Sequence, residues 1–196
     1  MITEGLRRPL FLEAMAKSNS AGSGMYASKE LRRQEKKADV PSVQAWTDES
    51  FPGLDAATVA KSEELQAESK DALTREDWDA LEKASRARLE LVPDSLNARK
   101  NLAHARYHRG SAALAARRYK EAETLLNESL AFQRQQYGEN DESVGRTLLQ
   151  LGRAALGMAS RRAALERLTK AKDILSSSRF AVAECDEELA KLTSLG

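Results

Sequence analysis

The sequence predicts an all-α protein: a helical solenoid of about three helix pairs, followed by a capping helix and preceded by an extended N-terminal arm. Small residues return every 42 residues, as at Ala80, Ala122 and Ala164. Good helix formers dominate the composition, and no stretch shows the sustained β-branched alternation of a strand. A fixed period of about 20–50 residues in helical sequence is typical of stacked repeats, whose units bury a common core.

Other positions keep the same period. Ala84, Leu126 and Leu168 form a second set, Ala87, Ser129 and Ala171 a third, and Gly110 and Gly152 share a position upstream. Small side chains at fixed places on helices let neighbouring helices approach closely. The pattern therefore predicts closely packed helix pairs.

Residues 1–55 differ from the rest, and we expect them to form the N-terminal arm. A short helix is predicted around Leu6–Lys17, followed by a Ser/Gly-rich stretch with the composition of a flexible linker. Trp46 and Phe51 are isolated apolar residues further along. Such a segment buries little against itself, which leaves two interpretations open: a disordered arm, or an arm that folds on a partner with these two aromatic residues as anchors.

From residue 56 onward the pattern is helix after helix, interrupted at turn residues. We expect repeat units over 56–94, 96–136 and 140–177, each built from two paired helices. A last helix within 179–196 has an apolar stripe and an acidic opposite face. A terminal helix with one polar face is what a solenoid needs to cover its exposed core, so we interpret it as the capping helix.

Within the units, the residues resemble a tetratricopeptide repeat. The third unit carries Leu151-Gly152, Ala164, Leu168 and Ala171, and the second carries Gly110, Tyr119, Ala122 and Leu126. The first unit matches weakly, because Trp78 and Pro93 are each offset by about one residue. The resemblance covers about residues 56–178 and implies a right-handed solenoid. The 42-residue period and the Tyr137-Gly138 turn resemble the kinesin-light-chain type of this repeat.

The resemblance also implies that the first helices of the pairs line a groove for a partner. Its groove positions fall on His104, Tyr107, Ser111 and Leu114 in the second unit, and on Arg146, Leu149, Arg153 and Leu156 in the third. This mixed surface would suit a peptide with acidic and apolar residues, since arginine pairs bidentately with carboxylates. The same residues could instead cover the helix surface, contact the arm, or form part of a broader docking surface.

Charge is balanced overall and uneven along the chain. The net charge of +1 argues against a protein that binds nucleic acid over its whole surface. Acidic residues outnumber basic ones over 61–96, and the reverse holds over 97–136. The basic second unit leaves contact with RNA as an alternative, although it has too few aromatic residues for a base-stacking platform.

The residue types that carry chemistry are sparse. His104 and His108 lie four apart on a helix, but a metal site needs three or four donors and there are no other histidines. A surface role or a pH-sensitive contact near pH 6.5 is the better interpretation. Cys185 is the only cysteine, which excludes an internal disulfide. We expect no catalytic residues, no metal, no other cofactor and no small-molecule substrate.

These features predict a non-catalytic scaffold that occupies a defined place in a larger assembly and joins other protein subunits. A transient peptide-binding adaptor and a ribonucleoprotein subunit are the alternatives. No apolar run approaches the length of a membrane span. We expect an intracellular protein, in the cytoplasm or a cytoskeletal or ciliary structure, with an organelle interior also open.

Overall fold

The computed structural model describes residues 53–194, and these residues form helices without any strand. The helices are α2 (Ala56–Thr74), α3 (Trp78–Leu91), α4 (Leu96–Ala115), α5 (Tyr119–Tyr137), α6 (Glu142–Gly157), α7 (Arg161–Ile174), the short 3-10 helix η3 (Leu175–Ser177) and α8 (Arg179–Ser194). The predicted all-α fold is confirmed. Trp46 and Phe51, the anchors in one of the two interpretations of the arm, lie outside the described residues.

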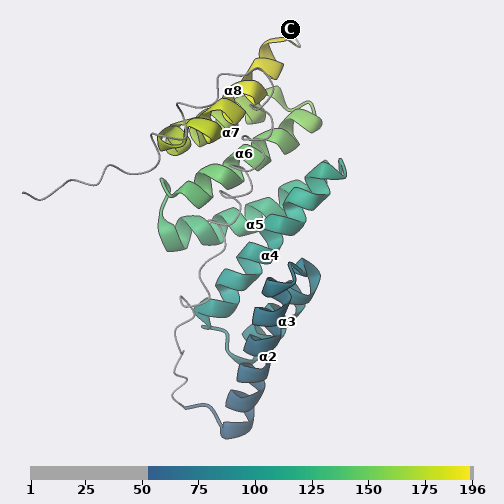
Figure 1. Cartoon of the computed structure of the whole chain (residues 1–196), viewed down its shortest axis with the longest axis vertical. Helices are drawn as coiled ribbons and strands as arrows, with labels where there is room; N and C mark the ends of the chain where they lie inside the picture. Colours follow the sequence, from purple (N-terminus) through teal and green to yellow (C-terminus); the bar gives the residue numbers. More distant parts are fainter. Residues whose placement is uncertain (1–52, 195–196) are drawn as a thin grey trace, which may run out of the picture. The chain divides into compact units, whose positions relative to one another are not determined.

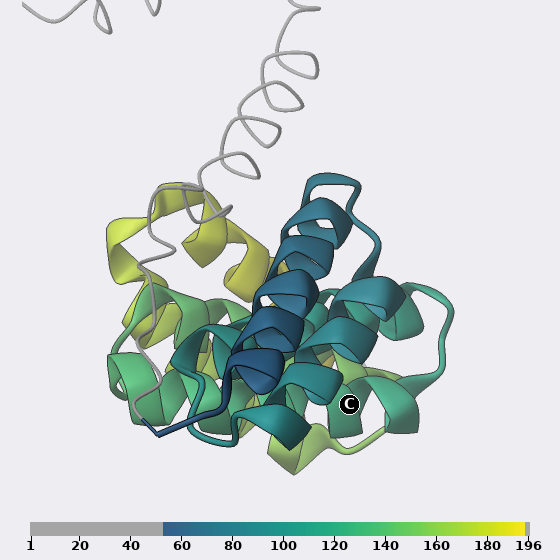
Figure 2. The same cartoon turned by 90° about the horizontal axis from the view of Figure 1, so that it is seen from below.

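Each helix packs against the next one along the chain, so that α2 and α3, α4 and α5, and α6 and α7 form successive pairs (Figure 1). In addition, α4 contacts α6, and α6 contacts α8. Helices α4, α6 and α8 therefore form one layer, and each second helix packs beside the first helix of its own pair. Figure 2 looks along the stack with α2 in front. This arrangement confirms the predicted helical solenoid.

Capping side chains explain where several of the helices begin. Asp55 accepts hydrogen bonds from the backbone N–H groups of Ala57 and Thr58, both at 3.0 Å, at the start of α2. Asp77, Ser95 and Asp141 accept equivalent bonds at the starts of α3, α4 and α6. Each side-chain oxygen accepts a hydrogen bond from a backbone N–H of the first helical turn, which has no acceptor within the helix. These residues therefore mark the points at which the helices begin.

The turn inside each pair repeats the same backbone geometry. Glu76, Arg117 and Ala159 have left-handed φ values of 54°, 59° and 56°. One residue later, the backbone N–H reaches back five residues to a carbonyl of the first helix, as Ser160 does to Ala155 at 2.9 Å. This bond closes a Schellman motif, which ends the first helix and turns the chain into the second.

The turns also show that the first unit is shifted by one residue relative to the predicted register. The second helices begin at Trp78, Tyr119 and Arg161, which are 41 and 42 residues apart rather than 42 throughout. Leu81, not the half-buried Ala80, therefore corresponds to Ala122 and Ala164, and all three are fully buried. The remaining positions shift in the same way: Ser85 corresponds to Leu126 and Leu168, and Arg88 to Ser129 and Ala171.

The core of the second and third units explains the two periodic glycines. A Cβ atom on Gly110 would lie 2.8 Å from Cγ of Leu126, and one on Gly152 would lie 2.5 Å from Cδ2 of Leu168. Both leucines are fully buried and belong to one core that continues to Cys185 in α8. Each glycine therefore lets the leucine of the paired helix pack directly against the backbone of its neighbour.

Candidate protein-binding surface

We call the surface formed by α4 and α6 the first-helix face, since it carries all eight of the expected groove residues. His104, Tyr107, Ser111 and Leu114 of α4 are half-buried, as are Arg146, Arg153 and Leu156 of α6. Leu149 is only 4% exposed and belongs to the core. Tyr107, Leu114 and Leu156 also pack against the core with part of their surface, which leaves their remaining parts for a partner.

Half-buried aromatic rings gather where α3 meets α4. The indole of Trp78 stacks on the imidazole of His108 with centroids 3.9 Å apart and planes 8° from parallel. Tyr107 meets the same imidazole edge-on at 5.3 Å, and His104 lies 4.5 Å from it. We call these four residues the aromatic cluster. The sequence pattern placed the two histidines on one face, but only the packing of α3 on α4 adds Trp78.

His104 differs from the rest of the aromatic cluster in having a ring nitrogen shielded from solvent. Its Nε2 atom is shielded from solvent and has no hydrogen-bond partner among the described residues. Burial, reinforced by the nearby positive charge of Lys100, lowers the pKa of His104 to about 4. The imidazole is therefore neutral at physiological pH. For His104, the structure does not support the expected pH-sensitive contact near pH 6.5.

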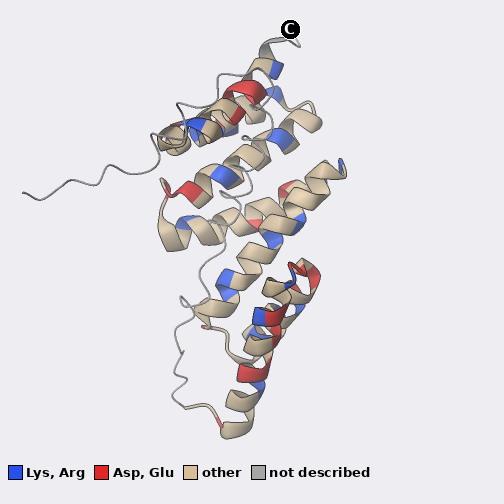
Figure 3. Cartoon of the chain, in the orientation of Figure 1, with Lys and Arg blue, Asp and Glu red and all other residues tan. Residues whose placement is uncertain are grey.

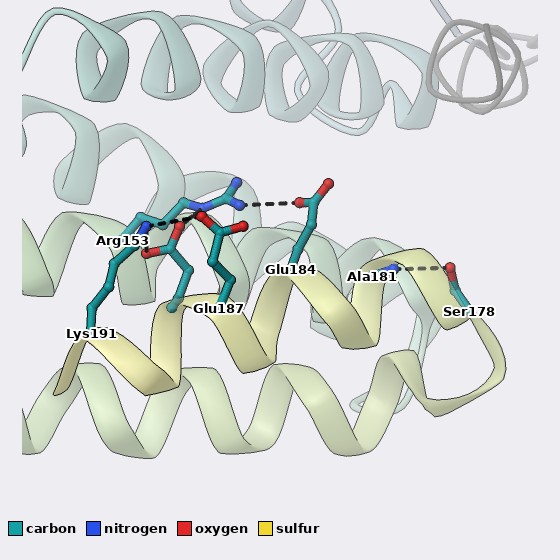
Figure 4. A network of polar contacts seen from close by, with 7 residues as sticks. Arg153, Ser178, Ala181, Glu184, Glu187 and Lys191 are labelled. Atoms are coloured by element: carbon teal, nitrogen blue, oxygen red, sulfur yellow. Dashed lines mark hydrogen bonds and ion pairs between the residues drawn. The ribbon is translucent and has the colours of Figure 1, made fainter. Parts of the chain in front are cut away.

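The two arginines among the expected groove residues are bonded to carboxylates of the same chain. Arg146 donates two hydrogen bonds to Glu142, one turn earlier on α6, at 2.8 and 3.1 Å. Arg153 reaches across to α8, where it meets Glu184 at 3.1 Å and Glu188 at 2.9 Å (Figure 4). The capping helix thus supplies the acidic groups that we expected a partner peptide to bring to Arg153.

Most arginines of the basic second unit are paired as well. Arg106 lies 3.1 Å from Glu128, Arg109 lies 2.8 Å from Asp79 and also bonds Glu82, and Arg118 lies 2.9 Å from Glu121. Arg99 binds Asp94 and the carbonyl of Pro93 in the loop before α4. Basic and acidic residues are accordingly interspersed along the helices rather than gathered on one of them (Figure 3). The excess of positive charge in this unit is largely compensated by neighbouring carboxylates.

Groups that could support chemistry are few in the part of the chain that the structure describes. Within residues 53–194 no three His, Cys, Asp or Glu side chains come together as metal ligands. Cys185 is fully buried, and burial raises the pKa of its thiol to about 11, so the thiolate nucleophile is scarce and inaccessible. None of the described helices is long and apolar enough to cross a membrane.

The stacked pairs and their half-buried outer surface define a helical-repeat protein of the kind that presents a surface to other proteins. Residues 101–177, which span most of α4 through α7, match the tetratricopeptide repeat family model. This family is a protein-protein interaction module. The match does not distinguish the kinesin-light-chain type, which stays a prediction.

Among solved structures, the complex of the TPR2B domain of yeast Sti1 with pHsp70 aligns at 20% sequence identity and a TM-score of 0.42, covering 70% of this chain and 99% of that one. A search of curated proteins found no match.

Proposed function

We propose that this protein is a non-catalytic scaffold subunit of a larger assembly and that it binds a neighbouring protein subunit through the first-helix face. The observation that carries this proposal is the aromatic cluster. Trp78, Tyr107 and His108 are half-buried, and their rings lie in direct contact with one another. Aromatic side chains that are partly buried and rigidly held are typical anchor points of protein interfaces.

The charged side chains of α6 on the first-helix face favour an apolar or aromatic anchor on the partner rather than an acidic one. Arg153 is already bonded to Glu184 and Glu188, and Arg146 to Glu142. An acidic peptide would have to displace a carboxylate of this chain to reach Arg153. This exchange would contribute little binding free energy, because one ion pair replaces another. An aromatic or aliphatic side chain packed on Tyr107 and His108 would instead bury apolar surface on both sides.

The same pairing makes protein a better partner than RNA. Binding to phosphates requires cationic side chains that can replace the counterions condensed on the nucleic acid. Arg106, Arg109 and Arg118 already face carboxylates of this chain. Within the second unit, residues 96–136, the basic residues for which the described part of the chain shows no ion pair are Lys100, Arg117 and Lys120. Three such charges would support only weak contact with RNA.

Site-specific photo-crosslinking tests the position of the interface. A photoreactive amino acid at Ala112, an exposed residue one turn from His108, should give covalent adducts with a protein partner in the native source. The matched control is Lys120, an exposed residue at the start of the second helix α5, which should give none. Adducts at Lys120 without adducts at Ala112 would show that the first-helix face is not the interface.

Stoichiometry then separates a scaffold subunit from the alternative, a transient adaptor. A tagged full-length chain isolated gently from its source should retain its partners at a constant molar ratio, measured by quantitative mass spectrometry. A shifting, substoichiometric set of partners would favour the adaptor. Retained RNA that is lost on mild salt increase, without crosslinked protein, would favour the ribonucleoprotein alternative.

A further inference from the structure

The outward stripe of α7 stands apart from the rest of the surface. Six residues spaced three and four apart line a shallow hollow of about 440 Å³: Arg162, Leu165, Glu166, Thr169, Lys170 and Asp173. Leu165 is 54% exposed, more than any other large hydrophobic side chain of residues 53–192. Residues with this spacing share one helix face, which is the geometry that a second helix packs against.

The corresponding position in the other two units is a contact between units. Counted from the start of each second helix, Leu165 corresponds to Glu82 and Glu123. Glu82 of α3 is buried under Arg109 of α4, and Glu123 of α5 binds Arg167 of α7 at 2.7 Å. In the third unit the position holds an exposed leucine instead, and the described part of the chain places no following unit on it.

The charges that flank Leu165 alternate along α7 in the order Arg162, Glu166, Lys170 and Asp173. No ion pair joins any of the four to another residue within 53–194. If a second α7 lies antiparallel on the first about a two-fold axis, Arg162 meets Asp173 of the other copy, and Glu166 meets Lys170. Each contact occurs twice by symmetry, and Leu165 packs beside the methyl group of Thr169. The stripe is thus complementary to itself, as a two-fold interface requires.

We infer that the outward stripe of α7 is a homodimer interface, in which a second copy of this chain packs its own α7 antiparallel on the first. This contact is separate from the first-helix face and goes beyond the proposed function. One helix on one helix makes a small interface, so the dimer is weak and concentration-dependent. Burial of Leu165 supplies most of its stability, and the exposed ion pairs set the antiparallel register.

Sedimentation velocity of the full-length chain over a range of about 1–300 µM tests the dimer at low ionic strength. The wild type should shift from monomer toward dimer across this range. Leu165→Glu should remain a monomer, because it removes the apolar contact and adds charge to it. The matched control is Lys120→Asp, which changes an exposed residue at the position of α5 that corresponds to Arg162, and it should dimerise as the wild type does.

A charge-swap experiment makes the test specific for the antiparallel register. Arg162→Asp and Asp173→Arg should each weaken self-association about tenfold, since each places like charges together twice. Mixed in equal amounts, the two variants should form a heterodimer, in which both contacts again join opposite charges. Thermal unfolding monitored by circular dichroism checks that each variant folds. A wild type that stays monomeric, or a dimer that these variants leave unchanged, would overturn the inference.

Discussion

Gly138 holds φ = 90° and ψ = 168°, a backbone conformation that is essentially restricted to glycine. An added Cβ would meet no atom within 4 Å, so steric crowding plays no part. We predict that Gly138→Ala lowers the free energy of unfolding by about 1–3 kcal/mol through backbone strain alone. Urea denaturation measures the loss. Asn140→Ala, an exposed change in the same turn, serves as control and should stay within about 0.5 kcal/mol of wild type.

His104 should make the protein less stable in acid. Burial keeps its folded-state pKa at about 4, whereas the unfolded chain has an ordinary histidine with a pKa near 6.5. Below pH 6.5 the histidine is protonated in the unfolded state but stays neutral in the folded state. The free energy of unfolding therefore falls between about pH 6.5 and pH 4 and then levels off. The loss amounts to about 3 kcal/mol at most. His104→Phe should flatten this part of the stability profile, and an unchanged slope would contradict the assignment.

At the scale of the elements, the contact between the two helices of a pair sets how closely they pack. Gly152 on α6 faces Leu168 on α7, with room for a hydrogen atom but not for a methyl group. Leu168 is fully buried and belongs to the core. The close approach therefore depends on two residues from different helices. The effect of a substitution at one of them on stability should depend on which residue occupies the other position.

We predict that Gly152→Ala costs about 1–2 kcal/mol, because overpacking against Leu168 exceeds the gain of about 1 kcal/mol in helix propensity. A double-mutant cycle with Leu168→Ala checks the cause. In the Gly152→Ala background, truncation of Leu168 should cost at least about 0.5 kcal/mol less than in the wild type, since the new methyl group fills part of the cavity. Additive effects would show that the two residues do not interact.

At the scale of the whole molecule, stability is expected to be a sum of unit stabilities and contacts between neighbours. The attachment of α8 illustrates this. Its buried face covers the end of the core with Ala181, Cys185 and Leu192, and its acidic face holds Arg153 through Glu184 and Glu188. Because α8 packs mainly on α6 and α7 of the third unit, disturbance of this contact should remain local.

We predict that Arg153→Ala loosens α8 by about 1–3 kcal/mol, because Glu188, which is largely buried, loses its partner on α6. Hydrogen exchange read by mass spectrometry should show faster exchange in α8 and little change in α2 and α3. Lys172→Ala removes a more exposed ion pair to Asp186 and should have a much smaller effect, below about 1 kcal/mol. Equal loosening by both variants, or a change spread over all helices, would contradict this account.

The sequence by itself determined the all-α class, the helix pairs and the register of the second and third units. These features depend on signals that lie close together in the chain: capping residues such as Ser95 and Asp141, the apolar periodicity of the helices, and small residues such as Gly110 and Gly152. A helix and its caps form from residues within a few turns of one another, so the pattern of the chain is enough to predict them.

Only the tertiary structure decided what the surface offers. It showed that the first unit is shifted by one residue, that Leu149 is core, that Trp78 joins His108, and that Arg153 is bonded within the chain. Arg153 and Glu188 are 35 positions apart, and nothing in the local sequence of either marks the other as its partner. Burial and ion pairing between helices depend on how the helices pack, so they appear only once the units are stacked.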